Sequence, residues 1–304
     1  MTVAAGEITS VRAWMLAARP ATLPAAAVPV IVGASAALSE GSPFRPFVFL
    51  ATLVCALLIQ IGTNFANDYS DFHRGADTDQ RLGPTRVTQS GLISQDAVKR
   101  GIILAFGLAV LLGAALAWIG GWPIIAIGVF SVLAGLAYTG GPFPFGYHGL
   151  GDVFVFIFFG LIAVTGTAYL QSGHWSALPL IVSVPIGLLT TNILVINNLR
   201  DRPTDTVAGK RTLAVRLGDR ATRGQYTLFT ALAYTIPVAT AFADPARGWL
   251  MLPLLTLPFA IALVRAVLGG TSGRDLNIIL KRRGQLLLLF GLLLAVGAFL
   301  GRTR

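Results

Sequence analysis

Amides and carboxylates recur at a spacing of four residues in two polar segments of this sequence. In the first segment, Asn67 precedes Asp71 by four residues. In the second, Asn197 precedes Asp201 by four, and Asp205 follows four residues later. Positions i and i+4 lie on one face of a helix, so each segment would present its oxygens on a single stripe. Carboxylate and amide oxygens without histidine or cysteine suit Mg²⁺, Mn²⁺ or Ca²⁺ rather than zinc. The pattern predicts a divalent metal site between two helix ends.

Basic side chains lie beside both segments. Arg74 follows the first, and Lys210 and Arg211 follow the second. Mg²⁺ in proteins takes one or two carboxylates and completes its coordination with water and substrate phosphate. Nearby cations stabilise the charge that builds on a departing diphosphate. The two segments together therefore predict a site for a metal-bridged diphosphate.

Helix capping is the alternative explanation for these side chains, because aspartate and asparagine are common at helix ends. A single Asn-x-x-x-Asp segment would favour capping. Two copies, each joined to an apolar stretch and followed by basic residues, favour the metal site.

The stretches that must position these residues are almost free of charge. Of the 304 residues, 55% are apolar and 12% are charged, whereas about 25% of the residues of a soluble domain are charged. Between Gly101 and Leu199 the only charged residue is Asp152. Lipid offers no partner for peptide groups, so the backbone of such stretches must be helical. The composition predicts an all-α integral membrane protein.

Nine apolar segments are separated by glycine, proline and charged clusters. They predict nine transmembrane helices in one bundle with a central cavity open to the cytoplasm, and a single domain over residues 1–304 with aspartate-rich loops at 64–100 and 197–223. The first segment follows Arg12 and Arg19 and could imitate a cleaved signal peptide, but Pro20, Pro24 and Pro29 favour a kinked, permanent helix. The nine segments are 21–38, 47–66, 102–119, 122–139, 152–171, 178–199, 226–242, 249–268 and 285–301.

The distribution of basic residues predicts the orientation. With nine spans, 19 of the 23 lysines and arginines fall on the side that carries the two polar loops. By the positive-inside rule this side is cytoplasmic, which predicts a multi-pass protein of the inner or plasma membrane with its active-site loops in the cytoplasm. Topology and anionic lipid account for the net charge of +10. The basic loops lack the stacking aromatics of a nucleic-acid-binding surface.

A polyprenyl diphosphate would explain a metal site at the mouth of a membrane protein. Its diphosphate needs metal and water, while its tail needs hydrocarbon, where each buried CH₂ contributes about 0.8 kcal/mol. The expected layout is a polar pocket, closed by the two loops, above a groove between helices that is open to lipid.

The two motifs and the nine spans resemble the UbiA superfamily of intramembrane aromatic prenyltransferases. The resemblance implies that Mg²⁺ ions bridge the prenyl diphosphate and that Lys210 and Arg74 contact phosphate. It also implies that Asp71, Asp201 and Lys210 are catalytic. Gly75 occupies the place of a third aspartate in the family's first motif, and Asp77 arrives two residues late. The metal ligands that the resemblance implies are Asn67, Asp71, Asn197, Asp201 and Asp205, with Asp68 and Asp77 assisting.

Several short motifs are similar to one branch of this superfamily, the 1,4-dihydroxy-2-naphthoate polyprenyltransferases of menaquinone biosynthesis. These motifs are "RPATLPAAAVPVIVG" (19–33), "NDYSDFHRGAD" (67–77), "GPTRVTQSGLIS" (83–94) and "YTGGPFPFGYHGLGDVFVFIFFG" (138–160). The resemblance implies transfer of a polyprenyl group to 1,4-dihydroxy-2-naphthoate with loss of CO₂, which gives demethylmenaquinol.

The remaining candidate residues are expected to bind substrate. Tyr138 and Tyr147 would line the acceptor pocket, although tyrosines are common at membrane interfaces in any case. For Asp152, a helix cap and a role in the site are equally compatible with the sequence, and Arg19 could be an interfacial anchor or a site residue. The full set of predicted substrate-binding residues is Arg19, Asn64, Arg74, Tyr138, Tyr147, Asp152 and Arg211.

Two other functions remain open at this stage. Within the superfamily, the acceptor could be 4-hydroxybenzoate or homogentisate. A cation-coupled transporter could also carry repeated motifs, but it predicts ionisable groups near the bilayer midplane. Here the carboxylates cluster at the ends of the spans, which favours the enzyme.

Overall fold

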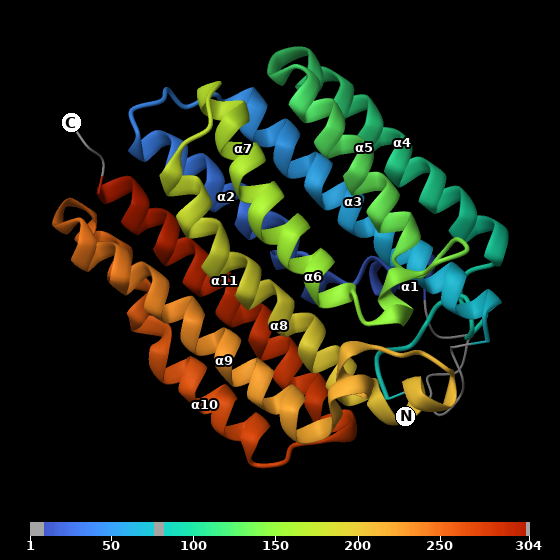
Figure 1. Ribbon diagram of the computed structural model, residues 1–304. Coiled ribbons are helices and arrows are strands. Elements are labelled where there is room, and N and C mark those ends of the chain that lie inside the picture. The colour runs from blue at the N-terminus through green and yellow to red at the C-terminus, as the bar shows by residue number, and fades with distance from the viewer. Residues whose placement is uncertain (1–8, 76–81, 302–304) are drawn as a thin grey trace.

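The computed structural model describes residues 9–75 and 82–301, and within these ranges the chain is helical with no β-strand. The helices lie side by side in an elongated bundle (Figure 1). In chain order the elements are α1 (Ser10–Ala18), η1 (Pro20–Thr22), α2 (Pro24–Ser39), α3 (Pro46–His73), α4 (Gln95–Gly120), α5 (Trp122–Ala137), η2 (Phe145–His148), α6 (Gly151–Val155), η3 (Phe156–Ile162), α7 (Ala163–Ser172), α8 (Ala177–Val207), α9 (Leu213–Ala243), η4 (Pro245–Thr256), α10 (Leu257–Leu268), η5 (Gly273–Asp275) and α11 (Leu276–Leu300).

All nine predicted segments are helical, but they differ in their capacity to span a membrane. In the described part of the chain, seven helices are long and apolar enough to cross. The segment formed by α1 and η1 meets α2 at an angle of 51°. If these elements together count as one broken span, the number of spans is eight. α5 has 16 residues, fewer than the roughly 20 that cross 30 Å of hydrocarbon. The all-helical prediction is confirmed, while nine spans stays a prediction.

α8 is the central helix of the bundle. Its most apolar stretch is 78% buried, whereas the corresponding stretches of α3 and α4 are each 22% buried. Its apolar side chains form one large core with α2, α9 and α11, in which Val28, Leu189, Tyr226 and Phe290 are completely or almost completely buried. The central position of α8 explains why its carboxyl end can reach a site shared with several other helices.

The helix from α6 to α7 changes its winding as it passes α8. Its middle part, η3, is a π-helix, and Gly160 in η3 meets Gly187 in α8 so closely that a Cβ on Gly160 would lie 2.6 Å from the Gly187 Cα atom. π-helical turns are rare and occur frequently at functional sites. This turn carries Phe159 to the wall of the cavity described below.

Four exposed tryptophans lie at the end of the bundle opposite the two polar motifs. Trp118 lies in the last turn of α4, Trp122 begins α5, Trp175 lies before α8, and Trp249 lies in η4. Tryptophan is enriched where a membrane protein meets the headgroup region. The tryptophans therefore mark one membrane interface, and the candidate site lies at the other.

Candidate functional site

A cavity of about 420 Å³ opens at the end of the bundle where α3 and α8 both terminate. Its deeper walls are apolar and include Val155, Phe159 and Leu280, whereas its mouth is polar. Ten of the residues predicted from the sequence line it: Arg19, Asn64, Asn67, Asp71, Tyr138, Tyr147, Asn197, Asp201, Asp205 and Lys210.

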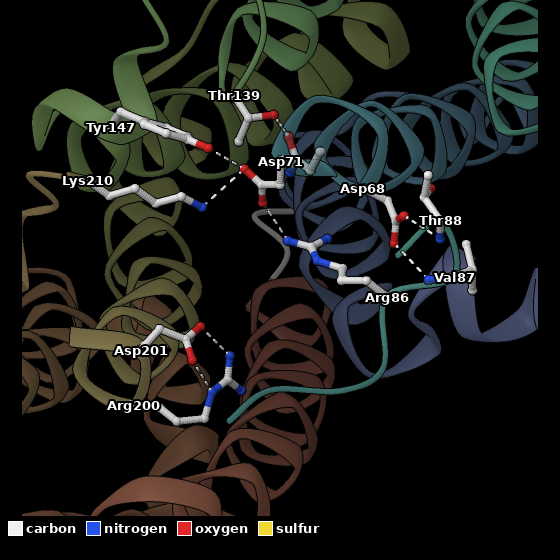
Figure 2. Close-up of polar contacts among 11 residues, drawn as sticks. Asp68, Asp71, Arg86, Val87, Thr88, Thr139, Tyr147, Arg200, Asp201 and Lys210 are labelled. Carbon is white, nitrogen blue, oxygen red and sulfur yellow. Dashed lines mark hydrogen bonds and ion pairs between the residues drawn. The ribbon is translucent and has the colours of Figure 1, made fainter. Parts of the chain in front are cut away.

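Asp71 is the centre of the polar mouth. One of its oxygens accepts hydrogen bonds from the Tyr147 hydroxyl at 2.7 Å and from Lys210 Nζ at 3.1 Å (Figure 2). The other accepts from Arg86 Nη2 at 2.7 Å. Asp71 is only 2% exposed, so its negative charge is balanced by the two buried or nearly buried cations around it. These contacts join α3 to the segment after residue 81 and to the loops around Tyr147 and Lys210.

Asp201 belongs to a second cluster, on α8. The Arg200 guanidinium donates a hydrogen bond to each of its carboxylate oxygens, with N–O distances of 2.8 and 2.6 Å. Arg200 also donates to Asn277 Oδ1 at 2.7 Å, and Asn277 donates to the Leu82 carbonyl oxygen at 2.9 Å. The cluster therefore ties α8 to α11 and to the segment that carries Arg86.

Asp68 lies outside the cavity, although the family resemblance implied that it assists in metal binding. Its carboxylate accepts hydrogen bonds from the backbone N–H groups of Val87 at 3.2 Å and Thr88 at 3.0 Å. α3 continues unbroken to His73, and successive residues on a helix are turned by about 100°. Asp68 is thus turned away from Asn67, and its carboxylate meets the backbone of the later segment, whereas Asn67 and Asp71 line the cavity. Asp68 anchors the segment that presents Arg86.

Tyr147 connects several residues that the sequence had suggested separately. Lys210 Nζ lies 4.5 Å from the centre of its ring and Arg74 Cζ lies 5.6 Å from it. Its carbonyl oxygen accepts from the backbone N–H of Arg211 at 2.8 Å. Arg74 and Arg211 do not line the cavity; Arg74 donates to the Gly141 carbonyl oxygen. Both residues thus hold the loops that frame the site.

Asp152 is buried between helices and does not line the cavity. Its Oδ2 atom accepts from Gln225 Nε2 at 2.6 Å, which joins α6 to α9. Asp77 lies outside the described residues.

Tyr138 lines the cavity, where its phenol hydroxyl can donate a hydrogen bond.

Arg19 enters the cavity from a left-handed backbone conformation. Its φ and ψ are 53° and 69°, and it is the one non-glycine residue with positive φ in the described part of the chain. This conformation costs about 1–2 kcal/mol for a residue with a side chain, and it persists only where surrounding contacts impose it. Asn64 Nδ2 supplies such contacts, since it donates to the Ala18 carbonyl oxygen at 2.9 Å and to Thr22 Oγ1 at 3.3 Å.

Two arginines of the site were missed in the sequence. Arg86 and Arg200 both line the cavity and bind its aspartates. Arg86 lies within the "GPTRVTQSGLIS" motif, which was noted only as a resemblance, and Arg200 directly precedes Asp201. The one usable signal was that Arg200 directly precedes Asp201, whereas no carboxylate lies beside Arg86 in the sequence.

The side chains at the mouth of the cavity supply oxygen donors of the kind that hard divalent cations prefer. Oxygen donors from α3 and α8 face one cavity, and Mg²⁺ requires only one or two protein carboxylates when water and phosphate supply the remaining ligands. Within residues 9–75 and 82–301, no three acidic, histidine or cysteine side chains lie close enough together to hold a metal ion unaided. The protein therefore offers two partial ligand sets, which a bound diphosphate would complete.

Comparison with known proteins gives consistent results. The UbiA prenyltransferase family model matches residues 26–282. The 1,4-dihydroxy-2-naphthoate octaprenyltransferase of Mycobacterium tuberculosis is 39% identical over 282 residues, which cover 93% of this chain and 95% of the relative. The enzyme of the same name from Escherichia coli is 36% identical over 304 residues, covering 97% and 98% of the two chains.

Among solved structures, a UbiA homolog from Archaeoglobus fulgidus bound to GPP and Mg²⁺ has the same fold, with a TM-score of 0.64 at 13% identity. The match covers 94% of this chain and 99% of that structure. The family model spans most of the chain, and the two bacterial relatives align over nearly its whole length. This chain, a multi-pass membrane protein, therefore belongs to the UbiA prenyltransferase family.

Proposed function

We propose that this protein transfers a polyprenyl group from a polyprenyl diphosphate to 1,4-dihydroxy-2-naphthoate with loss of CO₂, producing demethylmenaquinol for menaquinone biosynthesis. The observation that carries the proposal is the cavity itself: carboxylates, amides and cations converge at its mouth, and apolar side chains line its depth. The two bacterial relatives named above, whose identity to this chain extends over almost its full length, support the naphthoate as the acceptor.

The mouth of the cavity is suited to the diphosphate. Asp71, Asp201 and Asp205, with the amides of Asn67 and Asn197, would hold Mg²⁺, which supplies charge neutralisation to the departing diphosphate. The solved structure of a UbiA homolog with GPP and Mg²⁺ supports this choice of metal.

The cations around Asp71 would also serve the diphosphate. Lys210 and Arg86 contact Asp71 in the structure, and both reach the cavity. With Asp71 among the residues that would hold Mg²⁺, the two cations would be available to the phosphate oxygens, where they would stabilise charge on the leaving group. Tyr147 keeps Lys210 in place through its ring and holds Asp71 through its hydroxyl.

The walls of the cavity govern the organic part of the reaction. Cleavage of the allylic C–O bond leaves its electron pair on the diphosphate and an allylic cation that Phe159 and the neighbouring apolar side chains shield from water. The electron-rich naphthoate attacks with the carbon that bears its carboxylate, and the new C–C bond forms there. Loss of CO₂ then returns an electron pair to the ring and restores its aromaticity, so no base is needed at that carbon.

The proposal includes the arrangement in the membrane. We propose a single domain over the chain, nine spans, and a site that faces the cytoplasm from the cell membrane. The excess of basic residues at the end that carries the site supports this orientation. The transporter alternative loses its basis, because the family is one of prenyltransferases.

The decisive test follows the carboxyl carbon of the acceptor. Purified protein is incubated with Mg²⁺, a polyprenyl diphosphate and 1,4-dihydroxy-2-naphthoate labelled in its carboxyl group, with EDTA in a parallel sample. We expect metal-dependent release of labelled CO₂ in equal amount to prenylated product. Prenylation of 4-hydroxybenzoate or homogentisate, with no turnover of the naphthoate, would overturn the choice of acceptor and leave the metal chemistry intact.

A further inference from the structure

A second hollow lies on the outside of the bundle, between α3 and α4 and beside α1. We call it the α3–α4 groove; its volume is about 470 Å³. Its lining shares no residue with the cavity of the candidate site, so it is not a branch of the substrate pocket. The described residues that line it are apolar apart from one arginine: Trp14, Leu58, Ile61, Phe65, Ala97, Arg100, Gly101, Leu104, Ala105 and Leu108.

Gly101 makes room for the Trp14 ring at one end of the groove. A Cβ atom on Gly101 would lie 2.8 Å from the Trp14 ring and 3.3 Å from the Phe65 ring. These two rings meet edge to face, with 5.3 Å between their centroids. The indole of Trp14 therefore covers the groove at the level where α4 begins, and a larger residue at position 101 would collide with it.

The same end of the groove is basic. Arg100 lines it. Lys99, the preceding residue, and Arg12, on the adjoining α1, are also exposed. Within residues 9–75 and 82–301, the side chains of these three residues take part in no hydrogen bond or ion pair. Asp96, one turn before Arg100, is also exposed and offsets one of the three charges. The end retains a net positive charge.

The exposed side chains of α1 are those of a helix at a membrane surface. The apolar side chains of Val11 and Met15 are 70% and 53% exposed, and their exposure to water would be unfavourable. The same helix carries the exposed Arg12. Exposed apolar and basic side chains on one helix are typical of a helix that lies in the plane of the interface, with its apolar side chains toward the acyl boundary. From Arg100, the groove follows α4 to Leu108, about 12 Å of helix, and thus runs from this interface into the hydrocarbon.

We propose that the α3–α4 groove binds one phospholipid with an anionic headgroup. The headgroup phosphate lies against Arg100, where Lys99 and Arg12 add attraction, and one acyl chain follows Ile61, Leu104 and Leu108. The chemistry of the groove matches this ligand at both ends: a free cation at the interface and an apolar channel below it. A prenyl tail of the substrate fits less well, since its diphosphate must reach Asp71 in a cavity that the groove does not join.

Fluorescence quenching tests the proposal at Trp14. A variant with Trp118, Trp122, Trp175 and Trp249 replaced by phenylalanine retains Trp14 as the only tryptophan in the chain. It is reconstituted in vesicles in which phosphatidylglycerol or phosphatidylcholine carries brominated acyl chains, and its prenyl transfer activity shows that it is folded. We expect bromine on the anionic lipid to quench Trp14 more strongly than bromine on the zwitterionic lipid at equal content. Equal quenching by both would overturn the proposal, because it would show an ordinary lipid annulus.

A second measurement uses the protein with all its tryptophans. Native mass spectrometry of the detergent-solubilised protein with added phosphatidylglycerol counts bound lipids. Arg100→Gln should lower the apparent affinity of the tightest lipid about fivefold, the loss of about 1 kcal/mol for one cation near an anionic lipid. Arg282→Gln is the matched control, because Arg282 is exposed on α11, away from the groove. Equal binding by the two variants would refute the assignment, as would displacement of the lipid by a polyprenyl diphosphate.

Discussion

At the scale of single residues, Asp71 joins the two halves of the site, because it contacts Arg86, Lys210 and Tyr147 from three different segments. We expect Asp71→Asn to lower turnover by about 100-fold or more, as the loss of a group that organises transition-state charge does. It should also lower the melting temperature, because two buried cations lose their counter-charge. Turnover and thermal unfolding of the purified variant measure both effects.

The control for this change is Asp244→Asn. Asp244 lies at the opposite end of the bundle, 47% exposed, in an ion pair with Arg247. An exposed pair contributes little to stability, so this variant should keep its turnover. If Asp71→Asn retained half of the activity of the unchanged protein, the central role of Asp71 would be wrong.

A variant of Asp68 distinguishes a role in metal binding from a role in positioning a loop. Since its carboxylate holds the N–H groups of Val87 and Thr88, Asp68→Asn would oppose an amide N–H to a backbone N–H and release the segment that presents Arg86. We expect turnover to fall while the Mg²⁺ concentration for half-maximal activity stays unchanged. Asp201→Asn, in contrast, should raise that concentration about tenfold or more.

A double-variant cycle gives the same distinction independently. If Asp68 acts through Arg86, the effects of Asp68→Asn and Arg86→Gln on turnover should not add. A Mg²⁺ requirement that rises in Asp68→Asn, together with additive effects, would return Asp68 to the set of metal ligands.

At the scale of elements, the contact between η3 and α8 depends on two glycines. A methyl group at position 160 would meet the backbone of Gly187, which cannot move aside as a side chain does. Gly160→Ala should therefore destabilise the protein by about 1–3 kcal/mol, the usual cost of overpacking. It should also alter activity, because η3 carries Phe159 to the cavity wall.

Gly128→Ala is the matched control for this prediction. A Cβ at Gly128 in α5 would meet no atom within 4 Å, and alanine is the better helix former. Its melting temperature in detergent should equal or exceed that of the unchanged protein. Equal melting temperatures for both variants would show that the glycine contact is not needed.

The elements were the part of the structure that the sequence predicted best. Long apolar stretches without charge can only be helices in lipid, so hydropathy places all nine segments, including the helix interrupted by η3. The repeated spacing of four also predicted the stripe of Asn67 and Asp71, and that of Asn197 and Asp201. The π-helical turn left no such signal, because it arises from the close meeting of Gly160 and Gly187, two residues from different helices.

Residues whose roles depend on tertiary contacts were harder to predict. Asp68 belongs to the same motif as Asp71, yet the helical rotation turns it toward the backbone of a later segment. Arg74 and Arg211 have the charge expected of phosphate ligands but hold loops, whereas Arg86 reaches the cavity from a segment without an obvious pattern. Local spacing defines a face of a helix, and only the packing of several helices decides what that face meets.

At the scale of the whole molecule, the orientation in the membrane decides where diphosphate is released. The polar mouth and the excess of basic residues occupy one end, and four tryptophans occupy the other. If the basic end is cytoplasmic, an impermeant maleimide added outside intact cells should label cysteines only at the tryptophan end. The chain contains one natural cysteine, Cys55, within α3, and Cys55→Ala removes it as a background.

Two exposed positions probe the ends in that background. Ser272 lies between α10 and α11 at the end with the site, and His174 lies between α7 and α8 at the other end. We expect His174→Cys to react in intact cells and Ser272→Cys to react only after the membrane is opened. The reverse pattern would place the site outside, and labelling of both would indicate mixed insertion. Because the loops of the site hold most of the lysines and arginines, and each adds to the positive-inside bias, a single uniform orientation is the expected result.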